Sequence, residues 1–292
     1  GWYVVWLDGQ RLTEGPARFH PRFPEYEETC VELGEGCHVI AIQAHHVGVD
    51  TRMVPEMPPF MQCEARSGEA CLPIRWRGIL LPGYTRTGRR INPQLGWIEW
   101  CDTRAVPLNW TACAFDDADW PDVQEVQPPI GKPRPLSIGP VQSLPHSLTP
   151  IAEGSLVETF GYELDDPPGR FLLRDLSNTS LPPQGVWRRY DLGRVRLGRP
   201  RITLDVPAGA VIEFAHAEYL TNGRLAPHIN LSAGASANMD HFVARGGVQE
   251  FRPHTPKGGR FLEVHVIVDG PVRFVDEAFD ERCYFAEPVG TF

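Results

Sequence analysis

No apolar run in this sequence of 292 residues approaches the roughly 20 residues that a helix needs to cross a bilayer. The first residues, GWYVVWLDGQRL, also lack the basic start and the apolar stretch of a secretory signal peptide. They lack an initiator methionine as well, and they already resemble a strand. We therefore expect an excised fragment of a longer protein, whose localisation stays open with a slight preference for the cytoplasm.

The usual zinc-binding spacings are missing too, because neither a CxxC nor an HExxH motif occurs. The sequence has seven cysteines, an odd number with wide spacing, which does not predict a disulfide framework in a chain of this size. We expect most of these cysteines to be small buried hydrophobic residues. No cofactor is predicted, except that calcium stays open through an acidic cluster at 115–120.

The formal net charge of −9 excludes an overall basic surface, so neither nucleic acid nor a membrane is an expected partner. The stretch WRRYDLGRVRLGRPRI departs from this acidic balance, and it could form an anion or nucleic-acid groove. The favoured interpretation is a solvated strand face or edge, where long cationic side chains discourage unwanted pairing. Its arginines are Arg188, Arg189, Arg194, Arg196, Arg199 and Arg201.

Long helices are not predicted. Proline and glycine make up about a fifth of the residues, well above the usual share of roughly 12%. We also find no run of about 12 residues that lacks proline and glycine and shows apolar residues at the helical period. Short β-type runs recur instead, separated by turn residues: WYVVWLD, CHVIAIQAHHVGV, PIRWRGILL, RITLDV, VIEFAHAEYL and RFLEVHVIVDG. The predicted fold class is therefore all-β, with β-sandwich or jelly-roll domains.

The clearest strands alternate between apolar and polar side chains. In FLEVHVIV, Leu262 and Val264 share one face, whereas Glu263 and His265 share the other. This pattern is typical of a sandwich strand with one face in the core and one face in water.

A proline-rich segment separates the two halves of the sequence. Residues 127–150 contain seven prolines, which favour extended polyproline geometry and pair poorly in a sheet. We therefore predict a linker at 127–150 between a first β-sandwich domain at 1–126 and a second at 151–292.

A histidine and a carboxylate stand out in VIEFAHAEYL. With period two, His216 and Glu218 fall on the same strand face as Ile212, Phe214 and Leu220. The pair has three open interpretations: an acid–base pair with shifted pKa values, a contact to sugar hydroxyls, or a structural pair that is bonded to neighbouring strands.

Aromatic residues provide a second candidate for sugar binding. The stretch GWIEW places Trp97 and Glu99 on one strand face. Sugar-binding proteins stack exposed aromatic rings on the apolar face of a pyranose, and tryptophan has the largest such area. Aromatic residues also fill sandwich cores, so both interpretations stay open.

The densest acidic cluster lies in FDDADW and consists of Asp116, Asp117 and Asp119. A calcium or sugar site is one interpretation, because hard cations take several oxygen ligands from one loop. The favoured interpretation is a turn, in which an aspartate caps the backbone while Phe115 and Trp120 anchor it to the core.

The order of several motifs is informative. The first half contains YVVWLDGQRLTEGP, LGEGCHVIAIQAHHVG and FDDADW. The second half contains VWRRYDLGRVRLGRPRITLDVPAGAVIEFAHAEYLTNGRL, followed by DHFVARGGVQEFRPHTPKGGRFLEVHV. In this order the stretches resemble the N-terminal β-sandwich modules of bacterial α-L-rhamnosidases.

The resemblance implies a glycoside hydrolase whose catalytic domain, an (α/α)₆ barrel, would follow these modules. The catalytic carboxylates of the family belong to that barrel, so no catalytic residue is predicted here. The expected partners are the catalytic domain of the parent chain and a rhamnose-containing carbohydrate. A glutamate at the position of Glu218 is usual in these modules, which favours a structural role. The alternatives are a self-contained glycosidase and a lectin-like binding module.

Overall fold

The computed structural model describes residues 2–16, 23–51, 58–85, 90–91, 96–127, 131–139, 141–155, 185–221, 224–225, 230–231, 234–235 and 238–284. The regular elements in these ranges are all β-strands, so the predicted all-β class is confirmed. In the same ranges, no helix has the length and apolarity to cross a membrane.

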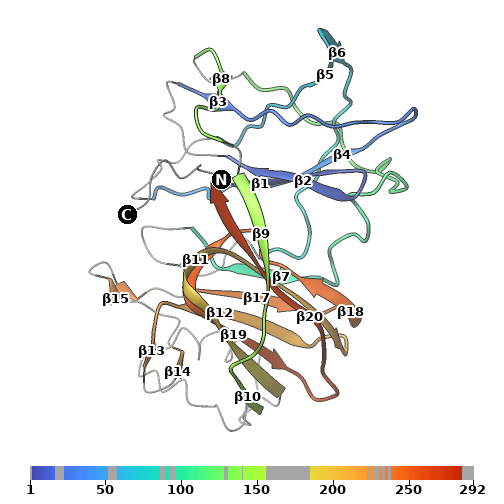
Figure 1. Ribbon diagram of the computed structural model, residues 1–292. Helices are drawn as coiled ribbons and strands as arrows, with labels where there is room; N and C mark the ends of the chain where they lie inside the picture. The colour runs from blue at the N-terminus through green and yellow to red at the C-terminus, as the bar shows by residue number, and fades with distance from the viewer. Residues whose placement is uncertain are drawn as a thin grey trace.

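The upper part of the molecule in Figure 1 contains a small antiparallel sheet with the strand order β2-β1-β4. Its strands are β1 (Trp2–Leu7), β2 (Gln10–Gly15) and β4 (Ile40–His45). Asp8 and Gly9 connect β1 to β2 with positive φ angles of 51° and 82°, as expected of an Asp-Gly hairpin turn. Two short ribbons lie in this part: β3 (Glu25–Tyr26) pairs with β8 (Arg134–Pro135), and β5 (Ala65–Ser67) pairs with β6 (Ala70–Leu72).

The lower part of the molecule is one large strand assembly with the order β7-β17-β12-β19-β11-β20-β9, and β10 and β18 also pair with β11. Its strands are β7 (Glu99–Asp102), β9 (Val141–Ser147), β10 (Ala152–Ser155), β11 (Gly185–Val206), β12 (Val211–Ala217), β17 (Met239–Val243), β18 (Gly247–Phe251), β19 (Lys257–Ile267) and β20 (Arg273–Tyr284). We call these nine strands the sandwich. Beside them lie the short pairs β13 (Leu220–Thr221) with β14 (Arg224–Leu225) and β15 (Asn230–Leu231) with β16 (Gly234–Ala235).

The long strand β11 divides the sandwich into two leaves. Its first half pairs with β10 and β19, and its second half pairs with β18 and β20. The pairing with β19 is irregular between Asp191 and Arg196, where Gly193 has a φ of 77° that favours glycine. The strand can therefore leave one leaf and enter the other without a separate connection.

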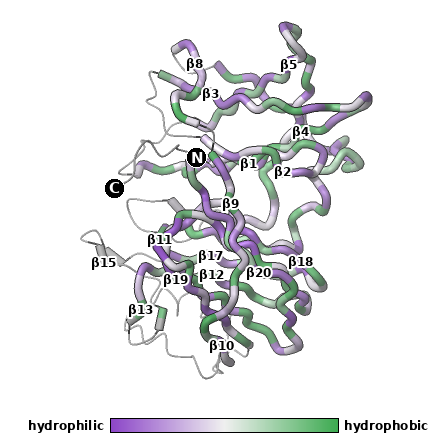
Figure 2. The backbone as a smooth tube through the Cα atoms, viewed as in Figure 1, coloured by the Kyte–Doolittle hydropathy of each residue, from purple (hydrophilic) through white to green (hydrophobic). Residues whose placement is uncertain are grey.

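The hydrophobic core lies between the two leaves. Figure 2 shows hydrophobic and hydrophilic positions alternating along these strands, as the period of two requires. The first leaf contributes Ile212, Phe214, Phe242, Leu262, Val264 and Val266, and the second contributes Ile202, Leu204, Val206 and Phe251. Each of these side chains is at most 3% exposed. Complete burial of one such side chain contributes about 1.5–3 kcal/mol, so this core is the main source of stability.

The predicted division at a linker differs from the observed strand pairing. Strand β7 falls in the range 1–126, yet it pairs in parallel with β17 of the sandwich. Strand β9 falls in the range 127–150, yet it pairs with β20. Pro145 is tolerated in β9 because this strand lies at the edge of the leaf, where no neighbour needs the missing N–H. The proline-rich segment therefore contains a strand, and both halves of the sequence build the sandwich.

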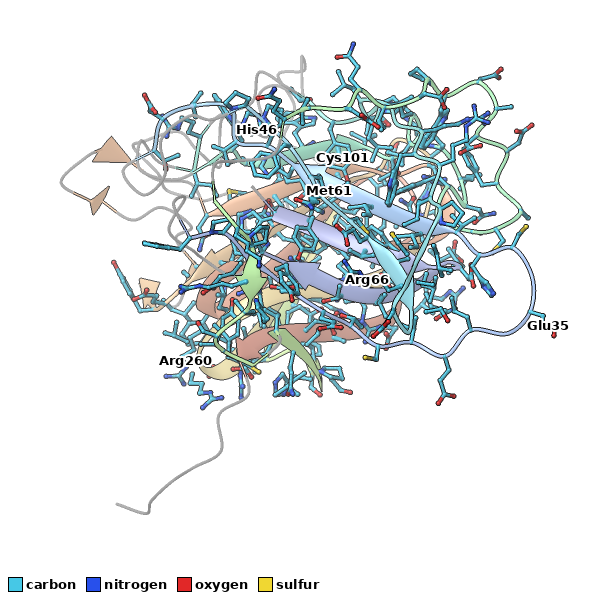
Figure 3. The ribbon with its side chains drawn as sticks, turned by 90° about the horizontal axis from the view of Figure 1, so that it is seen from above. Glu35, His46, Met61, Arg66, Cys101 and Arg260 are labelled. Atoms are coloured by element: carbon cyan, nitrogen blue, oxygen red, sulfur yellow. The ribbon has the colours of Figure 1, made fainter. Side chains whose placement is uncertain are left out.

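The expectation that most cysteines are buried is wrong. Cys30, Cys37, Cys71 and Cys113 are exposed, whereas Cys101 of β7 is buried in the core. The exposed cysteines lie in loops and in the β5–β6 ribbon, where few neighbours cover a side chain. Figure 3 shows Cys101 beside the strands of the sandwich.

Candidate functional site

A buried cluster of charged groups forms where β7 joins the sandwich. Glu99 of β7 is the cross-strand neighbour of Asp240 on β17, and its backbone N–H donates to Asp240 Oδ1 at 3.2 Å. Lys257, the first residue of β19, donates its ammonium to the same oxygen. The side chains of Lys257 and Asp240 are 3% and 0% exposed, so this ion pair is removed from water.

The carboxyl group of Glu99 is held by backbone groups. Its Oε2 accepts hydrogen bonds from the N–H of His254 at 2.7 Å and of Thr255 at 3.4 Å. Burial raises the pKa of Glu99 to about 8, and the negative charge of Asp240 adds to the increase. Because Lys257 is already paired with Asp240, Glu99 retains its proton at neutral pH and acts as a neutral hydrogen-bonding group.

His216 of β12 belongs to the same surroundings. Its side chain is 1% exposed, and within the described part of the chain neither ring nitrogen has a hydrogen-bond partner. Burial lowers its pKa to about 3, and the positive charge of Lys257 lowers it further. His216 is therefore a neutral imidazole, and Lys257 interacts electrostatically with both His216 and Glu99.

Two other predicted sugar-contact residues lie elsewhere. Strand β12 ends at Ala217, so the expected face does not continue to Glu218, which is exposed. Trp97 is half-buried, and its Nε1 donates to the carbonyl of Val47 at 2.8 Å. Of the four residues, the structure thus brings only Glu99 and His216 together around Lys257, in the interactions that it describes.

The acidic cluster Asp116, Asp117 and Asp119 is exposed and forms a turn. Asp116 Oδ1 accepts from the N–H of Ala118 at 3.0 Å, and Asp117 Oδ1 accepts from Arg77 at 2.7 Å. The rings of Phe115 and Trp120 pack edge to face with their centroids 5.3 Å apart. Across the described ranges, no group of three or more histidine, cysteine, aspartate or glutamate side chains converges enough to hold a metal ion.

A polar row on the other face of β12 was not predicted. Glu213 of β12 is the cross-strand neighbour of His241 on β17 and of His265 on β19. Trp100 of β7 and Trp187 of β11 extend the row at its two ends. The face that carries Glu263 and His265 was expected to be wet, but these residues are 0% and 1% exposed. Alternation revealed the two faces of β19, but it could not reveal that both are covered.

Ionic contacts run along this row. His241 and His265 lie 3.5 Å and 3.6 Å from the carboxylate oxygens of Glu213, and His265 Nε2 lies 3.2 Å from Glu263. Arg189 completes the series with a contact of 2.6 Å to Glu263. Although burial alone would lower the pKa of His265, the two carboxylates raise it to about 9. His265 is therefore an imidazolium clamped between two carboxylates.

The arginine-rich stretch contains no open cationic groove. Each of its six arginines contacts a carboxylate, and Arg189 and Arg199 are buried. The favoured interpretation of a solvated strand face is therefore only partly correct, because several of these side chains point into the molecule. The pairs are Arg188 with Glu153 and Glu277, Arg189 with Glu263, Arg194 and Arg196 with Glu281, Arg199 with Glu14, and Arg201 with Asp276 and Asp280.

The fold and these networks define a β-sandwich protein that contains several buried ion pairs. Residues 187–281 match the family model of the bacterial alpha-L-rhamnosidase concanavalin-like domain. These residues extend from β11 to β20 and include the row around Glu213. The predicted resemblance to the β-sandwich modules of bacterial α-L-rhamnosidases is thereby confirmed.

Solved structures of α-L-rhamnosidases share the fold of nearly the whole chain. A GH78 family rhamnosidase of Bacillus sp. GL1 aligns with a TM-score of 0.74 at 14% identity, over 98% of this chain. An α-L-rhamnosidase of Streptomyces avermitilis, crystallised with L-rhamnose, aligns with a TM-score of 0.64 at 17% identity, over 97% of this chain. An enzyme of Aspergillus terreus aligns with a TM-score of 0.59 at 18% identity.

The chain spans only part of these proteins. It covers 51% of the Bacillus chain, 26% of the Streptomyces chain and 31% of the Aspergillus chain. A search of the curated proteins finds no match. The likeness therefore describes a shared β-sandwich portion of larger enzymes.

Proposed function

We propose that this chain is a non-catalytic β-sandwich portion of an α-L-rhamnosidase-like glycoside hydrolase, and that it supports a separate catalytic domain. The observation that carries the proposal is the internal pairing of buried carboxylates. In the part of the chain that the structure describes, each buried carboxylate contacts a cationic side chain, a histidine or a backbone N–H. These residues are Glu14, Glu99, Glu213, Asp240, Glu263, Asp280 and Glu281.

Glycoside hydrolysis requires a different arrangement. Two carboxyl groups must flank the scissile bond, roughly 5–10 Å apart, with the sugar between them. Glu99 and Asp240 instead are cross-strand neighbours that are 9% and 0% exposed, so the pair does not line an open site for a sugar. Their neighbours are Lys257 and the backbone of His254, so the pair joins strands.

Activity measurements test this proposal. We expect no turnover of 4-nitrophenyl α-L-rhamnoside by the purified chain, whereas a longer form that includes the catalytic domain should be active. Removal of residues 1–292 from that longer form should lower its melting temperature. Turnover by the isolated chain that Glu99→Gln abolishes would overturn the proposal and favour a self-contained glycosidase.

Carbohydrate binding is the second candidate function. The Streptomyces relative was crystallised with L-rhamnose, and Trp97 and Glu218 retain exposed surface on this chain. We propose Trp97 and Glu218 as two separate candidate sugar contacts, because Glu99 and His216 are buried. Saturation-transfer NMR with L-rhamnose, D-galactose and D-glucose, with and without calcium, tests the idea. Transfer to one sugar that Trp97→Ala or Glu218→Ala removes would support it, and equal absence of transfer for all three would refute it.

A further inference from the structure

Four arginines gather where the small sheet meets the sandwich. Glu14 of β2 lies among them: its Oε2 accepts from Arg199 Nη1 at 2.5 Å, and its Oε1 accepts from Arg282 Nε at 3.0 Å. Arg11, three residues before Glu14, contacts the same carboxylate. Arg252, which follows β18, pairs with Asp280 at 2.7 Å. We call Arg11, Arg199, Arg252 and Arg282 the arginine cluster.

The arginine cluster carries more positive charge than its partners neutralise. Among the described residues, Glu14 and Asp280 are the two carboxylates that contact it, so two of its four guanidinium charges are not balanced there. Asp280 also contacts Arg201, and Asp240 nearby is occupied by Lys257. Glu250 interacts with Arg252 at longer range and is itself exposed to solvent. Excess charge of one sign in a half-buried place is costly unless a counter-charge joins it.

Two guanidinium nitrogens of the cluster have no hydrogen-bond partner among the described residues. Arg199 is 2% exposed, and its Nη2 makes no hydrogen bond within the described part of the chain. The same holds for Nε of Arg252. Arg282 differs, because it donates to the hydroxyl of Tyr284 and lies 4.9 Å from the ring of Trp2. Buried donors without a partner are rare and call for an acceptor.

The positive charges of Arg11, Arg199 and Arg252 repel one another. Burial lowers the pKa of Arg11 to about 10, and the charges of Arg252 and Arg199 lower it further. Burial also lowers the pKa of Arg252, with a contribution from Arg199. The side chains of Arg11 and Arg252 are each 21% exposed, so solvent reaches the cluster beside them.

We propose that a small oxyanion, a carboxylate, phosphate or sulfate group, binds among Arg11, Arg199 and Arg252. Its oxygens would accept from Arg199 Nη2 and Arg252 Nε, while its charge balances the excess of the cluster. Guanidinium groups bind such anions through paired, charge-assisted hydrogen bonds. The protein has a formal net charge of −9, so it does not attract anions in general, and binding at this site would depend on the local excess of arginines.

Calorimetric titration of the chain at constant ionic strength tests this site. Sodium sulfate, inorganic phosphate and D-glucuronate are titrated separately, and chloride maintains the ionic strength. We expect one saturable site for at least one of the three anions. Binding of D-glucuronate would identify an acidic sugar as the ligand class, and binding of sulfate or phosphate alone would identify an inorganic anion or its ester.

Variants distinguish this site from nonspecific binding. Arg252→Gln and Arg11→Gln should each weaken binding about tenfold or more, because each removes a charged donor. Arg260→Gln is the matched control: Arg260 is exposed, pairs with Asp191 and lies at the periphery in Figure 3, so its loss should leave affinity unchanged. Near-ultraviolet circular dichroism verifies that each variant is folded. Absence of saturable binding, or equal affinity in all three variants, would overturn the proposal.

Discussion

The N-terminal region, described residues 2–85, and the sandwich use similar residue types in opposite ways. In the N-terminal region Phe23 is 57% exposed and Leu80 is 74% exposed, and Val4 and Ala41 are its buried hydrophobic residues among those described. In the sandwich both faces of β12 are buried, including Glu213 and His216. The difference indicates that the sandwich provides most of the folding free energy, and that the small sheet depends on contacts such as Glu14 with Arg199.

Ion pairs differ in the same way. The pair that Arg75 of the N-terminal region forms with Asp122 has side chains that are 69% and 65% exposed, whereas Lys257 and Asp240 are almost fully buried. Exposed pairs gain little because water and salt screen them. A buried pair is different, since loss of one partner leaves the other charge without compensation.

Lys257→Met is expected to have the largest effect on stability. It leaves Asp240 buried without its cation, so the free energy of unfolding should fall by about 3–5 kcal/mol. Urea denaturation at pH 7 measures the change. Arg75→Met is the control from the N-terminal region, and it should leave the urea midpoint unchanged. Equal effects of the two variants would contradict the contrast between the regions.

Leu204→Ala sharpens the comparison of apolar residues. Leu204 of β11 is 0% exposed in the core, so its truncation should lower the free energy of unfolding by about 3 kcal/mol. Leu80→Ala removes the same atoms from an exposed site, and the change should stay within about 0.5 kcal/mol. Thermal unfolding of both variants provides the measurement. A loss at Leu80 as large as that at Leu204 would indicate that Leu80 is covered in solution.

Strand alternation and proline content were enough to predict the all-β class and the strands in the second half. The alternating side chains of Ile202, Leu204 and Val206 enter the core as expected. Pairing between distant strands was not predictable, because register depends on neighbours that one sequence does not reveal. This is why β7 and β9 were assigned outside the sandwich, and why the proline-rich segment 127–150 was predicted as a linker.

The sequence patterns identified some residues of the buried charged cluster and missed others. Glu99 and His216 were recognised as unusual polar residues in apolar strands, and the structure brings them to one cluster. Lys257 and Asp240 were missed, because neither belongs to a motif and only the fold places them beside Glu99. Glu218 does not share the face of His216, because strand β12 ends at Ala217 and the alternation had indicated a strand as far as Leu220.

The row around Glu213 should make stability fall at alkaline pH. His265 has a pKa of about 9 in the folded protein, raised above its ordinary value of 6.5 by two carboxylates. Its contribution is therefore complete below about pH 6.5 and is lost as the pH rises through 9, at an order-of-magnitude cost of about 3 kcal/mol. Urea denaturation at pH 7 and pH 9.5, for the unaltered protein and for His265→Gln, isolates this contribution. Identical losses in both proteins would contradict the assignment of a buried imidazolium.

Near pH 5, Glu99→Gln is expected to have the smallest effect, and it tests whether the junction of β7 with the sandwich contains a neutral carboxyl group. Because the pKa of Glu99 is raised to about 8, the folded protein keeps a proton that the unfolded chain releases above its ordinary pKa of 4.5. Stability should therefore decline as the pH rises from 4.5 to 8. Glutamine resembles the protonated acid, so the variant should nearly match the unaltered protein at pH 5 and be more stable than it at pH 8. If Glu99→Gln instead loses stability at both pH values, Glu99 is ionised and Lys257 serves two carboxylates.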